Sequence, residues 1–270
     1  MKKLLLMALL GSLKLVYAQS WFPLSQPLSV SGTSVTDEHR RGLFQNPALL
    51  ANTTHPLLFA EYDSRYGITE LSSKGLQFSY PFSHFTVSAD FRYSGFSAYH
   101  EMLTGLAFSR NFGGRFSMGL QFILDSRYAI ETDRYYTTLY PQLGLTLPLT
   151  DNLLLGFSVT NPFMVKMKFE TENRSLPSVY SLGLRLGLSE SVNWRIQADQ
   201  EISNQLRLGT AVDFSIIQKL GLQAGVQYIG YFVPAIGAGF YTKSMRYELT
   251  TTLHPLLGLT VAGGISYQFL

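Results

Sequence analysis

Apolar and polar side chains alternate along most of the chain from residue 57 onwards, and this period of two limits the fold more than any other feature. Neighbouring side chains of a β-strand point to opposite faces, whereas a helix repeats about every 3.6 residues. Each such run therefore predicts a strand with one apolar and one polar face. In the clearest run, residues 84–94, apolar Phe85, Val87, Ala89, Phe91 and Tyr93 alternate with polar Thr86, Ser88, Asp90 and Arg92.

The alternating runs predict about fourteen strands, an even number, as single-chain bacterial barrels have. Lipid offers no partner to a bare backbone N–H or C=O, so strands can cross a bilayer only when the sheet closes on itself. The predicted strands are residues 57–63, 74–80, 84–94, 100–110, 115–126, 136–147, 153–160, 178–188, 192–201, 205–216, 220–229, 235–242, 245–253 and 259–269.

The composition agrees with a membrane barrel. Charged residues make up 14% of the chain, whereas soluble domains have about 25%. No apolar run of about 18 residues follows the N-terminal stretch, which excludes a helical membrane protein. We therefore expect an all-β protein, a transmembrane antiparallel β-barrel in the outer membrane of a Gram-negative cell, in contact with outer-membrane lipid.

The N-terminus has the pattern of a secretory signal peptide over residues 1–18, with a basic start, an apolar run that Lys14 ends, and a small-residue cleavage site ending at Ala18. Removing it takes away three lysines, so that 18 Lys+Arg (21 − 3) balance 18 Asp+Glu. The neutral remainder gives no reason to expect nucleic acid as a partner. The expected organisation is signal peptide 1–18, an irregular segment 19–54 and a barrel 55–270.

The joins between strands indicate which end of the barrel faces outward. Residues 81–83, 111–114, 148–152 and 189–191 are tight turns, and they alternate with longer joins up to the loop 161–177. Outer-membrane barrels have short periplasmic turns and longer outside loops. This alternation predicts that both termini lie on the periplasmic side.

No constellation in the sequence points to catalysis or to a bound metal or cofactor. The five histidines are scattered without a short-spaced pair, there is no cysteine, and no nucleophile-elbow or phosphate-binding glycine pattern occurs. A Ser-His-acid set is recognised by geometry rather than by order, so it stays open at this point. We expect a protein that is not an enzyme and needs no cofactor.

Charged residues on the polar faces of the predicted strands are expected to point into the lumen. One interpretation is that they pair across strands and stiffen the wall. The other is that some line a substrate path, with Arg195 and Arg207 as the first to test. The residues are Asp90, Arg92, Asp125, Arg127, Arg185, Arg195, Asp199, Glu201, Arg207, Asp213, Arg246 and Glu248.

The segment before the first strand contains Asn46-Pro47-Ala48-Leu49-Leu50-Ala51. This motif resembles the long-chain fatty-acid transporter (FadL-like) superfamily and its PorV/PorQ relatives of type IX secretion, in which the N-terminal segment folds inside the lumen as a plug. The resemblance implies a plug over residues 19–54 with Asn46, Pro47, Ala48 and Leu49 as its gate motif. The alternative is a periplasmic tail with an ordinary Asn-Pro turn.

The last residues form an amphipathic strand with Phe269 next to the end. This ending resembles the signal that hands barrel proteins to the assembly machinery, although Leu270 replaces the usual final aromatic residue.

Two functions follow as hypotheses. In the first, the barrel transports a small hydrophobic or amphipathic molecule, as in the FadL-like family, with a strand kinked at Pro141 or Pro234 as a lateral exit. In the second, a PorV/PorQ-like barrel binds secretion-system proteins through its loops, chiefly 161–177. The short remaining loops favour the first.

Overall fold

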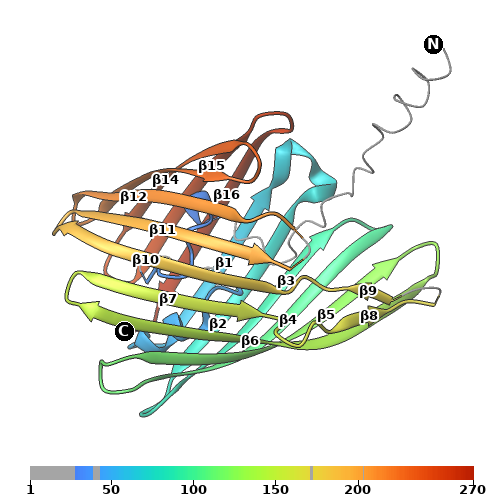
Figure 1. Cartoon of the computed structure of the whole chain (residues 1–270), viewed down its shortest axis with the longest axis horizontal. Helices are drawn as coiled ribbons and strands as arrows, with labels where there is room; N and C mark the ends of the chain where they lie inside the picture. Colours follow the sequence, from blue (N-terminus) through green and yellow to red (C-terminus); the bar gives the residue numbers. More distant parts are fainter. Residues whose placement is uncertain (1–27, 39–42, 171–172, 203) are drawn as a thin grey trace, which may run out of the picture.

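The computed structural model describes residues 28–38, 43–170, 173–202 and 204–270, and within them fourteen antiparallel strands close into one barrel (Figure 1). Each strand pairs with its neighbours in order, and the first strand pairs with the last over eight residue pairs, from Leu57 opposite Gln268 to Ser64 opposite Val261. The expected closed antiparallel barrel of about fourteen strands is confirmed. The expected signal peptide 1–18 and residues 19–27 lie outside the described residues.

Every predicted run overlaps one strand of the wall, because the alternation that identifies a strand also fixes which residues belong to it. The wall consists of β1 (Leu57–Ser64), β2 (Ser73–Pro81), β3 (Thr86–Gly95), β4 (Tyr99–Asn111), β5 (Ser117–Ala129), β6 (Arg134–Thr150), β7 (Leu153–Thr160), β10 (Val179–Ser189), β11 (Val192–Glu201), β12 (Arg207–Ile217), β13 (Leu220–Tyr228), β14 (Phe232–Tyr241), β15 (Met245–His254) and β16 (Gly258–Gln268).

The outer surface of the wall is apolar. On β4, Leu106 and Phe108 are exposed, whereas Leu103 and Ala107 on the opposite face are buried. The same alternation of buried and exposed positions recurs around the ring. A continuous apolar belt on a closed barrel is the surface that a bilayer covers. No helix among the described residues is long and apolar enough to span a membrane.

The two ends of the barrel differ in the length of their joins. The side of the barrel where β1 starts and β16 ends carries short joins, such as 82–85, 151–152 and 190–191. We call it the periplasmic end. The opposite end, called the outer end, carries the joins 65–72 and 161–178. These two joins contain short elements: η3 (Arg65–Gly67) and η4 (Thr69–Leu71) in the first, and the hairpin of β8 (Lys166–Lys168) and β9 (Asn173–Ser175) in the second.

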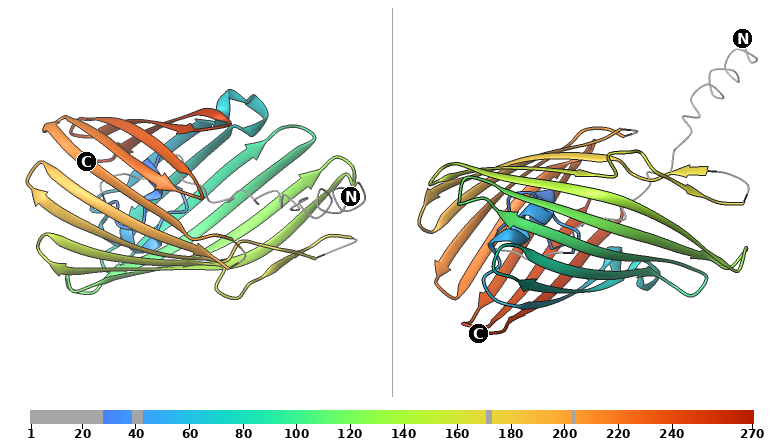
Figure 2. Two further views of the ribbon diagram at one scale, coloured as in Figure 1. Left: turned by 45° about the horizontal axis from the view of Figure 1, so that its top comes forward. Right: turned by 90° about the horizontal axis from the view of Figure 1, so that it is seen from below.

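Residues 28–38 and 43–54, here called the inner segment, lie inside the barrel, as the blue ribbon in Figure 2 shows. They include two short 3-10 helices, η1 (Val30–Gly32) and η2 (Pro47–Asn52). The apolar core of the protein lies between this segment and the wall. Its central cluster is Leu28, Leu43 and Phe44 of the inner segment with Phe59, Leu103, Ile123, Tyr140, Met167, Leu176 and Ala262.

Pro141 and Pro234, named above as residues that could kink a strand, each lie where the strand is paired on one side only. Neither interrupts its strand: Pro141 pairs with Phe122 and Pro234 with Val226 in continuous register. Pro141 comes directly before Gln142, the first residue of β6 that pairs with β7. Pro234 comes directly before Ala235, the first residue of β14 that pairs with β15. A proline has no N–H to donate, so it is tolerated where a ladder ends.

Candidate functional site: the lumen around the inner segment

Asn46 begins η2 and fixes it to the rest of the protein. Pro47 takes the first helical position, where a missing N–H leaves no bond unmade. The Asn46 Oδ1 accepts a hydrogen bond from the Ala48 N–H at 3.1 Å, so Asn46 is the N-cap. Its Nδ2 donates to the carbonyls of Val35 at 3.0 Å and Leu145 at 3.2 Å. One side chain therefore joins both parts of the inner segment to β6.

The rest of the Asn-Pro-Ala-Leu motif packs against the wall. The Pro47 carbonyl accepts a hydrogen bond from the Ser109 hydroxyl of β4 at 2.6 Å. Ala48 and Leu49 are buried. All four residues of the expected gate motif thus lie inside the barrel, in contact with β4, β5 and β6.

Glycines on the inward face of the wall make room for the inner segment. A Cβ added at Gly119 of β5 or Gly144 of β6 would overlap Pro47 and Ala48, and one added at Gly209 of β12 would overlap η1. The segment therefore lies directly against the backbone of the wall. Sequence reasoning did not identify these glycines as contact positions. The signal it missed is that they occupy inward positions of the alternation.

The predicted lumen charges lie on the inward face, and most of them have partners there. Several of their bonds join different strands, such as Arg92 of β3 with Glu61 of β1, which supports the interpretation that they stiffen the wall. The partners are Glu61 for Arg92, Arg127 for Asp125, Gln77, Ser88 and Gln121 for Asp90, and Arg195 for Asp213.

Two of the lumen arginines hold the inner segment. Arg195 of β11 donates to the Thr33 carbonyl at 2.7 Å and pairs with Asp37. Arg185 of β10 pairs with Glu38 at 2.7 Å. Arg195 is fully buried and Arg185 is partly exposed. The charges that sequence alone offered as a substrate path thus include two that anchor the segment.

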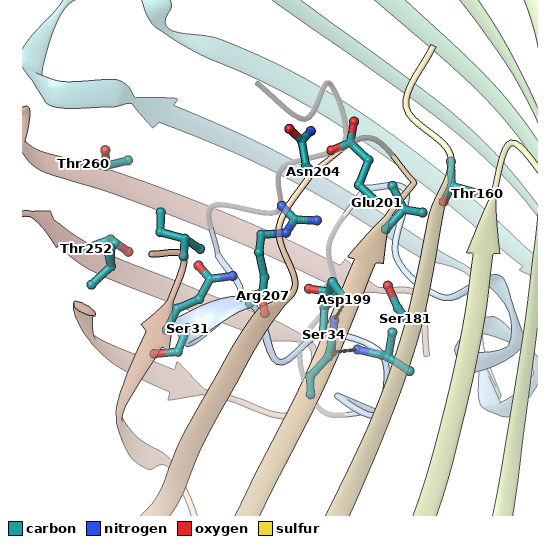
Figure 3. A pocket seen from close by; sticks show the side chains of 18 of the residues that line it. Ser31, Ser34, Thr160, Ser181, Asp199, Glu201, Asn204, Arg207, Thr252 and Thr260 are labelled. Atoms are coloured by element: carbon teal, nitrogen blue, oxygen red, sulfur yellow. Dashed lines mark hydrogen bonds between the residues drawn. The ribbon is translucent and has the colours of Figure 1, made fainter. Parts of the chain in front are cut away.

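A cavity of about 320 Å³ lies between the inner segment and the outer ends of the strands (Figure 3). Its floor includes Ser29, Ser31 and Phe44 of the inner segment. Asp199, Glu201 and Arg207, which the sequence placed in the lumen, line its wall, whereas Arg195 does not. Other lining residues are Arg65, Tyr66, Gln142, Ser158, Thr160, Val179, Ser181, Gln197, Asn204, Gln205, Gln227, Ile229, Tyr231, Val233, Thr252, His254, Leu257 and Thr260.

The outer rim of the cavity holds an aromatic cluster of Tyr66, Tyr231 and His254, in which the hydrogen bonds fix the tautomer of the histidine. The His254 Nδ1 accepts hydrogen bonds from the backbone N–H groups of Leu256 and Leu257 at 3.1 and 3.0 Å. Its Nε2 therefore carries the proton and donates to the Tyr231 hydroxyl oxygen at 2.5 Å. Burial raises the pKa of Tyr66 to about 12 and also raises the pKa of Tyr231. Both rings are thus neutral phenols near neutral pH.

The described residues include no group of three or more His, Cys, Asp and Glu side chains that could hold a metal ion. The cavity instead offers hydroxyls, amides and carboxylates on one side and aromatic and aliphatic side chains at the rim. This arrangement can bind a small molecule by hydrogen bonds and apolar contact.

No family model matches the chain, and no curated protein matches it. Solved structures do resemble it. The toluene transporter TodX of Pseudomonas putida superposes with a TM-score of 0.67 at 12% identity, over 90% of this chain and 96% of TodX. A Pseudomonas aeruginosa FadL homologue gives 0.60 at 11% identity, over 89% and 96%. The monoaromatic hydrocarbon channel CymD gives 0.59 at 9% identity, over 83% and 91%. The fold is therefore shared with FadL-type channels, in line with the resemblance seen in the sequence.

Proposed function

We propose that this chain is an outer-membrane channel for a small hydrophobic or amphipathic molecule and that the inner segment is its gate. The observation that carries the proposal is the cavity of about 320 Å³ between the inner segment and the outer end of a closed barrel. Pockets for small molecules begin at about 300 Å³. A molecule that enters from outside would reach this cavity first and meet the inner segment as its floor.

The gate role follows from how the lumen is filled. The inner segment packs against glycines of the wall and is tied down by Asn46 and Arg195. Passage through the lumen then requires this segment to shift, or an exit through the wall above it. Its anchors are hydrogen bonds and ion pairs rather than covalent links, so a shift is possible without unfolding the barrel.

Three structures that share the fold support the class of substrate. They are a toluene transporter, a monoaromatic hydrocarbon channel and a FadL homologue. Transport rather than catalysis is proposed for this chain as well.

We also propose that the last strand, with Phe269 packed on Tyr267 at 4.9 Å between ring centres, carries the signal for the barrel assembly machinery.

The gate is tested by locking the inner segment to the wall. Val30 forms a buried cluster with Ala211 and Ala235, and the chain has no cysteine of its own. The double variant Val30→Cys/Ala211→Cys in proteoliposomes is oxidised, and cross-linking is quantified by mass spectrometry. Uptake of ethylbenzene, 2-phenylethylamine and phenylacetate is then measured. We expect at least one probe to be taken up before oxidation. Its uptake should stop after oxidation and return after reduction.

The single variant Val30→Cys under the same oxidant is the control, because it cannot form the cross-link. Full cross-linking with unchanged uptake would contradict the gate. If none of the three probes enters faster than into empty liposomes, the transport function itself is wrong.

The second candidate, binding of secretion-system proteins as in PorV/PorQ barrels, depends on the join 161–178 as its docking surface. Lys166 and Lys168 of β8 are exposed there. Met167 between them is buried in the central apolar cluster, and the Asn161 Oδ1 accepts a hydrogen bond from the Val165 N–H at 2.8 Å. The loop is therefore fixed to its own barrel at Asn161 and Met167, although many of its other side chains are exposed. Transport, which the cavity supports, is the function supported best.

A further inference from the structure

Glu201, at the outer end of β11, is a buried carboxylate that faces the cavity (Figure 3). Only 6% of the residue is exposed. No hydrogen bond or ion pair joins its carboxylate to another of the described residues. Burial of an unpaired charge is costly, so a carboxylate in this position indicates a partner that is not part of the wall or the inner segment.

The two arginines that line the same cavity have carboxylates of their own. Arg65 lies 3.3 Å from Asp63, measured from Nε to the carboxylate oxygen. Arg207 stands directly opposite Asp199 in the register of β11 and β12. Positive charge in the cavity is thus balanced by these two acids. Among the described residues neither arginine forms an ion pair with Glu201, so its carboxylate is available to a ligand in the cavity.

Further polar atoms at the cavity lack a hydrogen-bond partner among the described residues. They are the hydroxyls of Ser29 and Ser31 and the Oε1 of Gln142. The Gln142 Nε2 already donates to the Ser158 hydroxyl at 3.2 Å, so its oxygen is left to accept. The Gln142 oxygen can only accept, and each serine hydroxyl can accept as well as donate, so the site can bond a ligand that carries N–H or O–H donors.

The rim of the cavity is suited to an apolar body. Tyr66 and Tyr231 pack against the His254 ring, with centroid distances of 5.6 and 4.8 Å. Ile229, Val233 and Leu257 line the same region. Neutral aromatic rings also attract cations through their faces. An apolar or aromatic group fits here beside a cationic head.

We infer that the cavity binds a small amphipathic amine, whose ammonium group pairs with Glu201 and whose apolar body lies against the aromatic rim. This inference rests on the proposed function and names its substrate class. An anionic amphiphile such as a fatty acid would place its carboxylate near Glu201, and the two negative charges would repel each other. A plain hydrocarbon would leave the Glu201 charge unpaired.

The test is a binding titration of the detergent-purified full-length protein by isothermal calorimetry. The probes are 2-phenylethylamine, ethylbenzene and phenylacetate, which share an aromatic body and differ in charge. We expect 2-phenylethylamine to bind tightest and phenylacetate weakest. Glu201→Gln keeps the size of the side chain and removes its charge, and it should weaken binding of the amine about tenfold while leaving ethylbenzene unchanged.

Glu131→Gln is the matched control, because Glu131 is an exposed carboxylate at the same end of the barrel that does not line the cavity. It should bind the amine as the unchanged protein does. Equal affinity for the three probes, or tighter binding of phenylacetate, would overturn the inference, and this ranking decides it even if Glu201→Gln fails to fold. Unchanged amine binding by folded Glu201→Gln would overturn it as well. Proteoliposome uptake without this preference would leave transport standing and the amine assignment wrong.

Discussion

Arg195 of the wall forms an ion pair with Asp37 of the inner segment, although the two residues are 158 positions apart in the chain. The same guanidinium bonds the Thr33 carbonyl and, at 2.7 Å, the carboxylate of Asp213 on β12. Two strands and the inner segment thus share one buried cation. This is the arrangement of an anchor, because loss of the cation removes a shared buried ion-pair partner from two carboxylates.

Replacing Arg195 is expected to release the inner segment. Removing one member of a buried ion pair costs about 3–5 kcal/mol, so Arg195→Ala should weaken the docking of the segment by a large factor while the wall stays closed. Planar-bilayer recordings should show a higher or noisier conductance. Arg195→Lys retains the charge but not the planar guanidinium group. Its conductance should lie between those of Arg195→Ala and the unchanged protein. Recordings of Arg195→Ala that match the unchanged protein would argue against the anchor.

Replacing an inward glycine is expected to push the inner segment out of place. In Gly144→Ala the new methyl group would meet Asn46 and Pro47, so the segment must move. We expect faster cleavage within residues 43–54 by an added protease. Gly187→Ala is the control, because the nearest atom to its Cβ would be at 3.6 Å, an ordinary contact. Equal cleavage of the two variants would count against close packing of the segment on the wall.

The two ends of the Asn46 amide are expected to have separable roles. Asn46→Asp keeps the oxygen that caps η2 but loses the donors to Val35 and Leu145. Asn46→Ala loses all three bonds. Each lost bond costs about 1 kcal/mol. Hydrogen exchange of residues 43–54 should therefore speed up moderately in the first variant and more in the second, and the reverse order would contradict the assigned bonds.

The strands could be predicted from the sequence because their signal is local. A lipid-facing side chain such as Phe122 and a lumen-facing one such as Gln121 differ in polarity at each step. The hairpin of β8 and β9 was missed, since three residues are too few to show a period of two. The start of β14 was also misplaced: the prediction starts at residue 235, whereas the strand begins at Phe232. Pro234 suggested a boundary, but only the pairing with β15 stops there, and the pairing with β13 continues.

The site could be predicted only in part. Alternation places Arg195 and Arg207 on the same inward face, but it does not indicate that the first meets the inner segment and the second the cavity. That difference depends on how deep each residue lies and on a segment more than a hundred residues away in the chain. The role of Gly144 was hidden for the same reason, because a close approach to Asn46 leaves no local pattern.

A charge on the outer surface of the wall is expected to destabilise the protein in lipid. Leu106, in the middle of β4, is 45% exposed on the outward face. Arginine at the centre of the bilayer costs about 2–4 kcal/mol in barrels. Leu106→Arg should lower the free energy of unfolding from lipid vesicles by this amount, measured by urea titration. Leu106→Ala is the control and should lose much less, and similar losses in both variants would contradict a lipid-facing Leu106.

The alternation of faces is tested most directly by spin labels on β5. The chain has no cysteine, so single cysteines at residues 120–125 can each carry one label. In lipid vesicles, labels at Leu120, Phe122 and Leu124 should be accessible to oxygen, which concentrates in the bilayer. Labels at Gln121, Ile123 and Asp125 should be shielded from it, because these side chains are buried in the lumen. Oxygen accessibility without a period of two, or equal access of a water-soluble relaxation agent to all six positions, would contradict a membrane barrel.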